Sequence, residues 1–276
     1  MNRMLDERPV AIKRRLHACP LDCTPLTRPV IHNLSDFFAV IYSTLDEKRT
    51  FWFRGHASIR FRLAPSALRY KDGIDRNTAL GLVQDIKRYL MMKLPQPPEA
   101  NDELGWMQVA QHYGLPTRLL DWTANAAVAL FFTCCSHDKE DGLVVILDPD
   151  QLNQSLDATR PRVFDANRDA EAIAPYFLLD GKKKRAGLPT IAINPTWNTE
   201  RIALQQGAFT LHGSRKFDLD TSQAPSLMYL PILKEYKSRL LGELQRVGVG
   251  EMFIFPEPEH VCNHLKRLAG LREWEP

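Results

Sequence analysis

The sequence has few cysteines, little net charge and no long hydrophobic run, and each shortage argues against a class of protein. Five cysteines occur among the 276 residues. Their number is odd and their spacing is irregular, and they do not form the paired arrangement of a zinc site. We therefore expect buried thiols in a reducing compartment, and we predict no bound metal.

Long apolar segments are also missing. The longest such run, residues 124–135, is interrupted by Asn125 and is too short to cross a bilayer. The opening residues, MNRMLDERPV, lack the apolar stretch of a secretory signal peptide. These features predict a cytoplasmic protein with no membrane partner.

The formal net charge is +3, which by itself is too weak to indicate a nucleic-acid partner. Two local basic clusters are present, at residues 13–15 and 182–185. Each cluster is typical of a solvated loop, and each is also suited to contacting phosphate groups. Glycine-rich phosphate loops, the HExxH zinc motif and the serine nucleophile elbow do not occur in the sequence.

The order of the segments predicts one α+β domain at residues 32–276, preceded by a basic N-terminal arm at residues 1–31. Apolar spacing and capping residues predict helices over 36–46, 77–94, 106–113, 124–136, 234–247 and 260–268. Strands are expected at 51–55, 142–148, 208–213 and 228–234, and a strand or turn at 252–255. Residues 149–200 are irregular, which suggests an insertion or a mobile loop.

The segment FWFRGH, residues 51–56, is the first candidate for a binding site. Arg54 follows an aromatic run, and a guanidinium group binds carboxylate or phosphate through a planar fork. Gly55 would let the backbone approach a ligand closely. The alternative is that Arg54 only ties down a loop.

The second candidate is AQHYGLPTRLLDWT, residues 110–123, which mixes polar and apolar residues. Arg118 and Asp121 stand three positions apart, among leucines and next to Trp122. A partly buried pair with satisfied hydrogen bonds would fix the wall of a pocket. Polar groups toward that pocket would come from His112, Thr117 and Thr123. For any one of these residues a purely structural role stays open.

These two segments resemble the FRG domain family, which is named for its (Phe/Tyr)-Arg-Gly motif. The resemblance continues through LAPSALR at residues 63–69, ALFF at 129–132, RIALQQGAFTLHG at 201–213 and GVGEMFIFPEPEHV at 248–261. It covers residues 34–270 in all. The sequence departs from the family at His56, where members often carry glutamine, and at Ala126, where proline often follows asparagine.

The aromatic-Arg-Gly strand is also similar to the first strand of arginine-type mono-ADP-ribosyltransferases. This second resemblance implies two small mixed sheets that flank an NAD-binding cleft, with helices around them. A late glutamate or glutamine completes the site in those enzymes, and Gln206 stands in a comparable place. The implied catalytic residues are Arg54, Asp121 and Gln206. The implied cofactor-binding residues are Arg54, Gly55, His56, His112, Thr117, Arg118, Trp122 and Thr123.

The resemblance thus implies an ADP-ribosyltransferase-like effector that cleaves NAD and transfers ADP-ribose to a nucleic-acid or protein acceptor. Glutamine at position 206 favours an acceptor other than arginine, such as a nucleic-acid base. Such an enzyme harms its own cell unless it is restrained, which implies a toxin with an antitoxin partner or a role in phage defence. The alternatives are a non-catalytic module that binds nucleotides, RNA or DNA, and an assembly protein in which these motifs only specify the fold.

Overall fold

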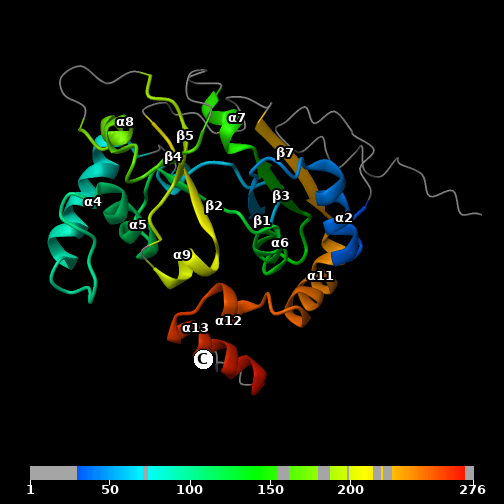
Figure 1. Ribbon diagram of the computed structural model, residues 1–276. Coiled ribbons are helices and arrows are strands. Elements are labelled where there is room, and N and C mark those ends of the chain that lie inside the picture. The colour runs from blue at the N-terminus through cyan, green and yellow to red at the C-terminus, as the bar shows by residue number, and fades with distance from the viewer. Residues whose placement is uncertain are drawn as a thin grey trace, which may run out of the picture.

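The computed structural model describes residues 30–70, 74–154, 162–179, 187–197, 199–213, 219 and 226–270. Nearly all of the basic arm predicted for residues 1–31 lies outside this part of the chain, and so does the basic cluster at 182–185. Within the described residues, strands and helices alternate irregularly along the chain (Figure 1). This mixed composition agrees with the predicted class.

Seven strands form one open sheet in the order β4-β5-β6-β2-β1-β3-β7 (Figure 1). Their bounds are β1 (Trp52–His56), β2 (Leu119–Thr123), β3 (Gly142–Leu147), β4 (Phe164–Asp165), β5 (Ile191–Asn194), β6 (Gly207–Leu211) and β7 (Leu227–Ile232). The pair β4–β5 is parallel, and the other neighbouring pairs are antiparallel. The prediction of two small sheets was therefore wrong, because the described strands all join one sheet.

The two halves of this sheet meet at a narrow junction between β1 and β2. Phe53 opposite Thr123 is the one residue pair that joins these two described strands. On its other edge β1 pairs with β3 from Trp52 to His56. Beyond this pair, the side chain of Arg54 links the two strands, because its Nη1 donates a hydrogen bond to the backbone oxygen of Asp121 at 2.6 Å.

Helices cover the sheet and continue below it (Figure 1). Those before β3 are α2 (Leu34–Thr44), α3 (Ser66–Arg69), α4 (Arg76–Leu90), α5 (Glu103–His112) and α6 (Ala126–Cys134). Those after it are α7 (Pro149–Gln154), α8 (Ala170–Ile173), the 3-10 helix η1 (Ala174–Tyr176), α9 (Glu200–Leu204), α11 (Lys234–Arg246), α12 (Glu251–Ile254) and α13 (Pro258–Leu268). None of the helices described here is long and apolar enough to cross a membrane.

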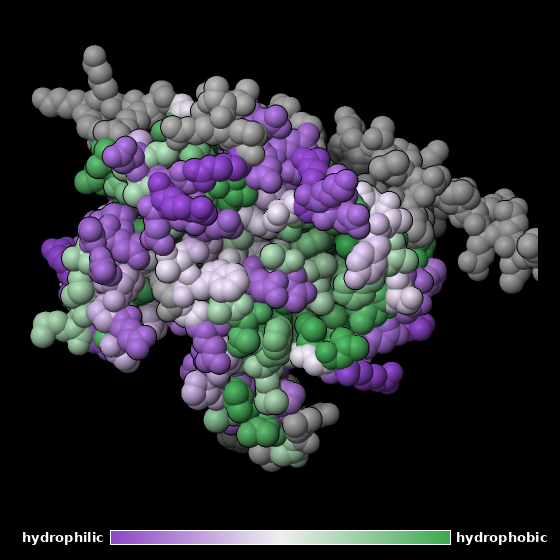
Figure 2. All heavy atoms as spheres, viewed as in Figure 1, coloured by the Kyte–Doolittle hydropathy of each residue, from purple (hydrophilic) through white to green (hydrophobic). Residues whose placement is uncertain are grey.

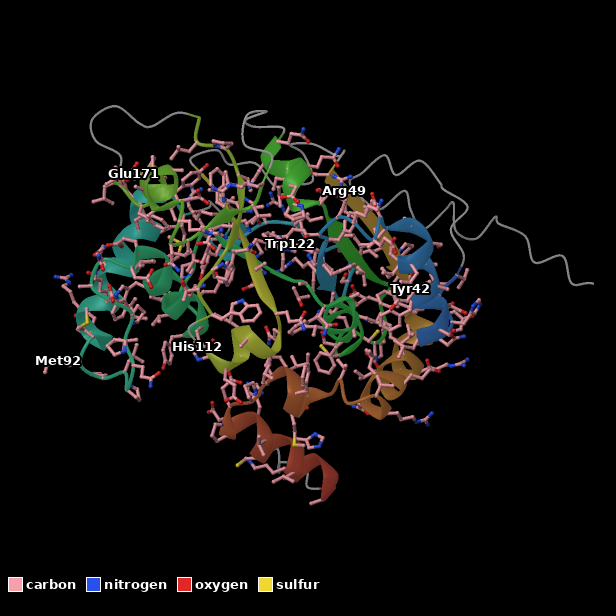
Figure 3. All side chains as sticks on the ribbon, viewed as in Figure 1. Tyr42, Arg49, Met92, His112, Trp122 and Glu171 are labelled. Atoms are coloured by element: carbon pink, nitrogen blue, oxygen red, sulfur yellow. The ribbon has the colours of Figure 1, made fainter. Side chains whose placement is uncertain are left out.

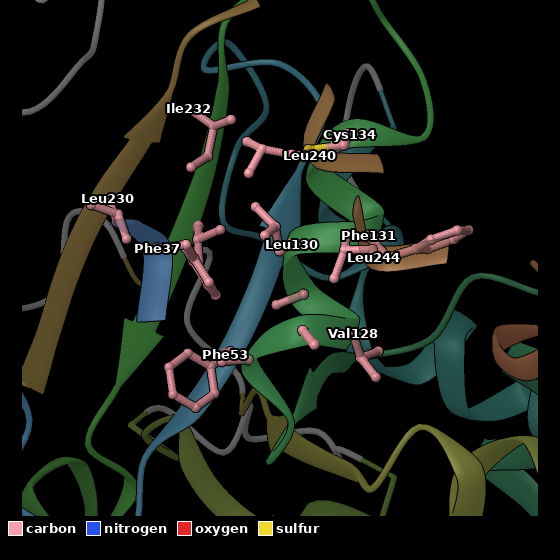
Figure 4. Close-up of a cluster of buried hydrophobic side chains, with 14 of the residues drawn as sticks. Phe37, Phe53, Val128, Leu130, Phe131, Cys134, Leu230, Ile232, Leu240 and Leu244 are labelled. Carbon is pink, nitrogen blue, oxygen red and sulfur yellow. The ribbon is translucent and has the colours of Figure 1, made fainter. Parts of the chain in front are cut away.

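One face of the sheet carries two separate hydrophobic cores. In the first core, α6, α11 and α2 pack on β1, β3 and β7 around Phe53 and Leu130 (Figure 4). In the second, α4 and α5 pack on β2, β5 and β6 around Trp106 and Phe209. The opposite face carries one core, in which Trp122 takes part, and this core extends across both halves. The separation of the first two cores leaves room at the β1–β2 junction.

The helix and strand predictions are largely confirmed, with shifts of a few residues at the ends. Asn33 caps α2 by accepting a hydrogen bond from the backbone nitrogen of Asp36 at 2.9 Å. Thr123 ends β2, and Asn125 caps the helix α6 that follows. Residues 252–255 were expected to form a strand or turn. They fall mostly in α12, because Ile254 is buried against the first core.

Three strands were not predicted. In the sequence LLDWT, which forms β2, the polar Asp121 lies on the face opposite Leu120 and Trp122. Because the residues around Asp121 are mostly apolar, the alternation of polar and apolar residues that marks a strand was not visible. Strands β4 and β5 come from residues 149–200, for which an insertion or a mobile loop was expected. They extend the sheet beyond β6. The described residues of this segment therefore contribute to the sheet itself.

A buried lysine ties α11 to the segments that follow β1 and α6. The Nζ of Lys237 donates to the backbone oxygens of Ala57, Ser136 and His137 at 2.8–2.9 Å, and to that of Glu140 at 3.3 Å. Burial lowers the pKa of this lysine. The carbonyl groups satisfy the ammonium group and so permit its burial.

The cysteines follow the prediction in part. Cys134 is buried, and burial raises the pKa of its thiol to about 12. Cys135 and Cys262 are exposed, so the expectation of buried thiols was wrong for them. All three are free thiols.

Candidate functional site

A cleft of about 310 Å³ lies at the junction of β1 and β2, between the two cores of the same face. Strands β1, β2 and β6 form its floor, and side chains from α5, α6 and α9 form its walls. Its volume is at the lower end of the range for small-molecule sites, which is roughly 300–1,000 Å³.

Arg54 lines this cleft and is held on two sides. Its Nη1 donates to the backbone oxygen of Asp121 and lies 3.6 Å from a carboxylate oxygen of the same residue. Its Nε donates to Nε2 of His56 at 3.2 Å. Burial lowers the pKa of Arg54 and Asp121 opposes this shift, but an arginine stays charged at neutral pH. Its Nη2 donates no hydrogen bond to any residue that the structure describes.

Asp121 faces the cleft and is positioned by neutral neighbours. The Nε2 of Gln111 donates to its Oδ1, and the hydroxyl of Thr117 donates to Oε1 of the same glutamine. The hydroxyl of Thr117 thus fixes the orientation of the Gln111 amide. The side chain of Asp121 is 60% exposed, so its carboxylate remains accessible from the cleft.

His56 lies behind Arg54, outside the residues that line the cleft. It is 4% exposed, and burial together with the charges of Arg54 and Arg69 lowers its pKa to about 3. The ring is therefore neutral at physiological pH. Since Nε2 accepts from Arg54, the ring proton belongs on Nδ1, which has no hydrogen-bond partner among the described residues.

Steric contact with helix α6 requires a glycine at position 55. A Cβ atom at this position would lie 2.0 Å from the backbone oxygen of Ala129 and 2.7 Å from the backbone nitrogen of Thr133, both in α6. The close approach that this glycine permits is therefore that of helix α6. Gly55 thus sets the distance between the floor of the cleft and one of its walls.

The opposite wall is basic and partly exposed. Arg201, on α9, lies 3.5 Å from Oε1 of Glu257, and its guanidinium carbon is 4.7 Å from the ring centre of Phe255. His112, at the end of α5, lies beside α9 (Figure 3). Burial lowers the pKa of His112, and the charge of Arg201 lowers it further, so this ring is also mainly neutral at pH 7.

Two further cleft residues, both on β2, are fixed by hydrogen bonds to β6 and to the ends of neighbouring helices. The Nε1 of Trp122 donates to the hydroxyl of Thr210 at 3.1 Å. The hydroxyl of Thr123 donates to the backbone oxygen of Gln205 and accepts from the backbone nitrogen of Asn125. These bonds hold the end of β2 rigidly beside α9.

The structure brings six of the predicted site residues together in the cleft. They are Arg54, Gly55, His112, Asp121, Trp122 and Thr123. Thr117 and His56 lie outside the lining of the cleft. Each forms a hydrogen bond with a residue that lines it: Thr117 with Gln111, and His56 with Arg54.

Arg118 and Gln206 lie outside the cleft lining for different reasons. Side chains three positions apart in extended backbone point to opposite faces, so Arg118 and Asp121 do not pair. Asp121 contacts Arg54 instead. Arg118 is buried and donates to the backbone oxygen of Gly213. Gln206 is exposed, in a turn with φ of +47°, and its backbone oxygen accepts from the backbone nitrogen of Ala124. Its neighbour Gln205 lines the cleft instead.

Sequence reasoning missed five polar residues of the cleft, Gln108, Gln111, Thr199, Arg201 and Gln205. The two glutamines of α5, together with His112, stand at positions i, i+3 and i+4, which form one face of a helix. A polar face on an otherwise apolar helix could have indicated that α5 borders a binding site. Arg201 and Gln205 gave no local signal, because only the packing of α9 beside β2 brings them to the cleft.

Comparison with known families adds one result. Residues 49–142 match the model of the FRG domain, so the chain contains an FRG domain in this segment. The match includes β1, α5, β2 and α6, and with them Arg54, Gln111 and Asp121. It is shorter than the resemblance in the sequence, which runs over residues 34–270, and α9 lies outside it. Searches of curated proteins and of solved structures found no match.

The donor groups of the site indicate what it could bind. Two arginines and several amide and hydroxyl groups suit an anionic ligand with hydroxyl groups. Across the described parts of the chain, no group of three or more histidine, cysteine, aspartate or glutamate side chains is placed to hold a metal ion.

Proposed function

We propose that this chain is an ADP-ribosyltransferase-like effector that binds NAD in the cleft and transfers its ADP-ribose to an acceptor. The observation that carries this proposal is the direct contact between Arg54 and Asp121 at the β1–β2 junction. A fixed cation and an accessible carboxylate thereby stand side by side in one pocket, and the reaction requires both.

Arg54 would bind the pyrophosphate of NAD. Nε and Nη1 donate to His56 and Asp121, so Nη2 would donate to the ligand. A guanidinium group that is already held in position loses little entropy when it binds an anion. Thr123, on the floor of the cleft, and His112, on one wall, would hydrogen-bond the ribose or the carboxamide of the nicotinamide half.

Asp121 would act on the bond that breaks. Cleavage of the bond between nicotinamide and ribose develops positive charge on the sugar ring, and a fixed carboxylate stabilises such a charge. Nicotinamide leaves with the electron pair of that bond, and a nitrogen or oxygen of the acceptor supplies a new pair to the sugar carbon. The proton of the acceptor passes to Asp121 and then to water. Asp121 fits this role better than Gln206, which is exposed and outside the cleft lining.

An enzyme that consumes NAD in this way would be toxic to its own cell when unrestrained. We therefore propose a protein antitoxin as its partner and a role as a toxin or in antiviral defence. The chemistry of the cleft and the FRG motif support this proposal.

The experiment follows nicotinamide release and label transfer together. The purified chain is incubated with NAD labelled on its adenylate phosphate, first alone and then with total cellular RNA or protein. We expect nicotinamide release and a labelled acceptor. Asp121→Asn should lower the rate by about 100-fold or more, and Arg54→Lys should mainly raise KM because lysine lacks the planar fork.

The matched control for the aspartate is Asp85→Asn on α4, which also removes an exposed carboxylate paired with an arginine, Arg88. It should leave the rate unchanged. If the wild-type chain neither binds NAD nor releases nicotinamide, the proposal is wrong. NAD binding that depends on Arg54 without any turnover would instead support the non-catalytic nucleotide-binding module.

A further inference from the structure

Arg201 lines the cleft, and most of its guanidinium group is not engaged by the described residues. Its side chain is 32% exposed, and its guanidinium group donates no hydrogen bond to any described residue. Its carboxylate neighbour, Glu257, lies at 3.5 Å, whereas a charge-assisted hydrogen bond to a carboxylate is about 2.7–2.9 Å long. Both carboxylate oxygens of Glu257 are buried without a hydrogen-bond partner. Nη1 of Arg201 is thus ion-paired with Glu257, and the other N–H groups of the guanidinium can donate to a ligand.

Aromatic packing holds this arginine in place. Phe255 lies under the guanidinium group at 4.7 Å, and the ring of His260 stacks on the same phenylalanine at 4.6 Å. Gln205 fixes α12 to α9 by donating to the backbone oxygen of Ile254 at 2.8 Å. Cation–π contact orients an arginine and leaves its N–H edge free, which suits the capture of a phosphate. Figure 2 shows hydrophobic side chains gathered over α12 and α13, where this support is built.

A fixed and exposed tryptophan accompanies Arg201. Trp197, in the link between β5 and α9, is 56% exposed although its Nε1 donates to the backbone oxygen of Gly207 at 3.1 Å. Gly207 pairs with the cleft residue Thr123, and Thr199 of the same link lines the cleft. The indole ring is thus anchored at the border of the cleft while more than half of its surface faces water. An immobilised exposed ring is a stacking surface.

We infer that Arg201 and Trp197 form the acceptor subsite and that the acceptor is a single-stranded nucleic acid. Arg201 holds a backbone phosphate, and Trp197 stacks on a base. This pairing of a cation with an aromatic ring is how proteins bind single strands with little sequence preference. The inference rests on the proposed function, in which Arg54 and Asp121 bind NAD on the floor of the cleft. The base then supplies the nucleophile to the ribose, nicotinamide leaves, and the proton of the base passes to Asp121.

The test measures binding in the absence of NAD, so it does not depend on turnover. The anisotropy of a short fluorescein-labelled oligouridylate is followed during titration with the full chain at several salt concentrations. Trp197→Ala and Arg201→Gln should each weaken binding about tenfold, and Trp197→Tyr should restore most of the loss. Arg201→Gln should also reduce the slope of log Kd against log salt by about 0.7, the value for one phosphate on a single strand.

Matched controls come from exposed residues on other elements. Tyr42→Ala on α2 and Arg88→Gln on α4 remove the same kinds of group and should change the binding less than twofold. Circular dichroism of every variant shows whether it is folded, and Trp197→Ala removes no core side chain. Oligouridylate binding that is absent, or that is equally affected by the control variants, overturns the inference.

Label transfer separates the inference from the proposed function. If nicotinamide is released but the label appears on protein and not on RNA, the acceptor assignment is wrong and the NAD reaction stands. If the oligouridylate binds through Arg201 and Trp197 but no nicotinamide is released, the nucleic-acid site stands and the NAD reaction is wrong. RNA that carries the label, with transfer reduced in Trp197→Ala, supports both.

Discussion

The Nε of Arg54 donates to the Nε2 of His56, two residues along the same strand, and this bond turns the guanidinium group toward β2. The histidine can accept this bond only while it is neutral, because both nitrogens of a charged imidazole are donors. Its burial keeps it neutral by lowering its pKa to about 3. At this position, where the FRG family often has glutamine, the chain has a neutral histidine that accepts the hydrogen bond from Arg54.

The pH dependence of stability tests this relationship. The folded state resists protonation of His56, whereas the unfolded chain takes up the proton near pH 6.5. The contribution of this histidine to stability is therefore lost as the pH falls below 6.5. His56→Gln keeps an acceptor for Arg54 but does not titrate. Between pH 7.5 and 5, the wild type should lose about 2 kcal/mol more unfolding free energy than the variant, as measured by urea denaturation. Parallel curves would contradict the assignment of a buried neutral ring.

Gly55→Ala tests the packing of α6 on the floor of the cleft. The new Cβ would lie 2.0 Å from the backbone oxygen of Ala129, so α6 must shift. We expect a loss of about 2 kcal/mol or more in the free energy of unfolding, because the obstacle is a backbone and not a flexible side chain. The control is Gly81→Ala in α4, where nothing lies within 4 Å, and which should stabilise the fold by about 0.5–1 kcal/mol. Equal effects at the two positions would be inconsistent with the close contact.

Lys237→Met tests the carbonyl cage beneath α11. The substitution removes the donor from four backbone oxygens, three of them at 2.8–2.9 Å. We expect a loss of about 3 kcal/mol in unfolding free energy, since buried acceptors without a donor are costly. Lys234→Met, the same change at an exposed position of the same helix, should alter stability by less than about 0.5 kcal/mol. A tolerated Lys237→Met would mean that water replaces the ammonium group.

Gln111→Glu tests the positioning of Asp121. The variant places a second carboxylate against Asp121 in place of an amide donor, and a like charge raises the pKa of a carboxyl group. If Asp121 acts as the base, the acid limb of the pH profile for nicotinamide release should move to higher pH. Gln84→Glu is the matched control, because Gln84 donates to the carboxylate of Glu103 in the same way but away from the cleft. An unchanged profile for Gln111→Glu would exclude Asp121 from the chemical step.

The FRG motif illustrates how far local sequence could predict the site. The sequence correctly indicated a strand that ends near Arg54 and a polar segment that ends in Asp121, since both have distinctive composition. It also placed Arg118 with Asp121, which was wrong because the segment is extended and the two side chains diverge. Gln206 was chosen by comparison with a family pattern, and its left-handed turn directs it to solvent.

By itself the sequence determined which elements form, because periodic apolar residues, caps and glycines act within a few residues of one another. Helices α2, α4, α5, α6 and α11 and strands β1, β3, β6 and β7 followed from such patterns. Only the tertiary structure decided that the strands join one sheet, that β1 and β2 are linked by a single residue pair, and that α9 brings Arg201 to the opening between them. Those features depend on contacts between residues far apart in the chain, and no local pattern encodes such contacts.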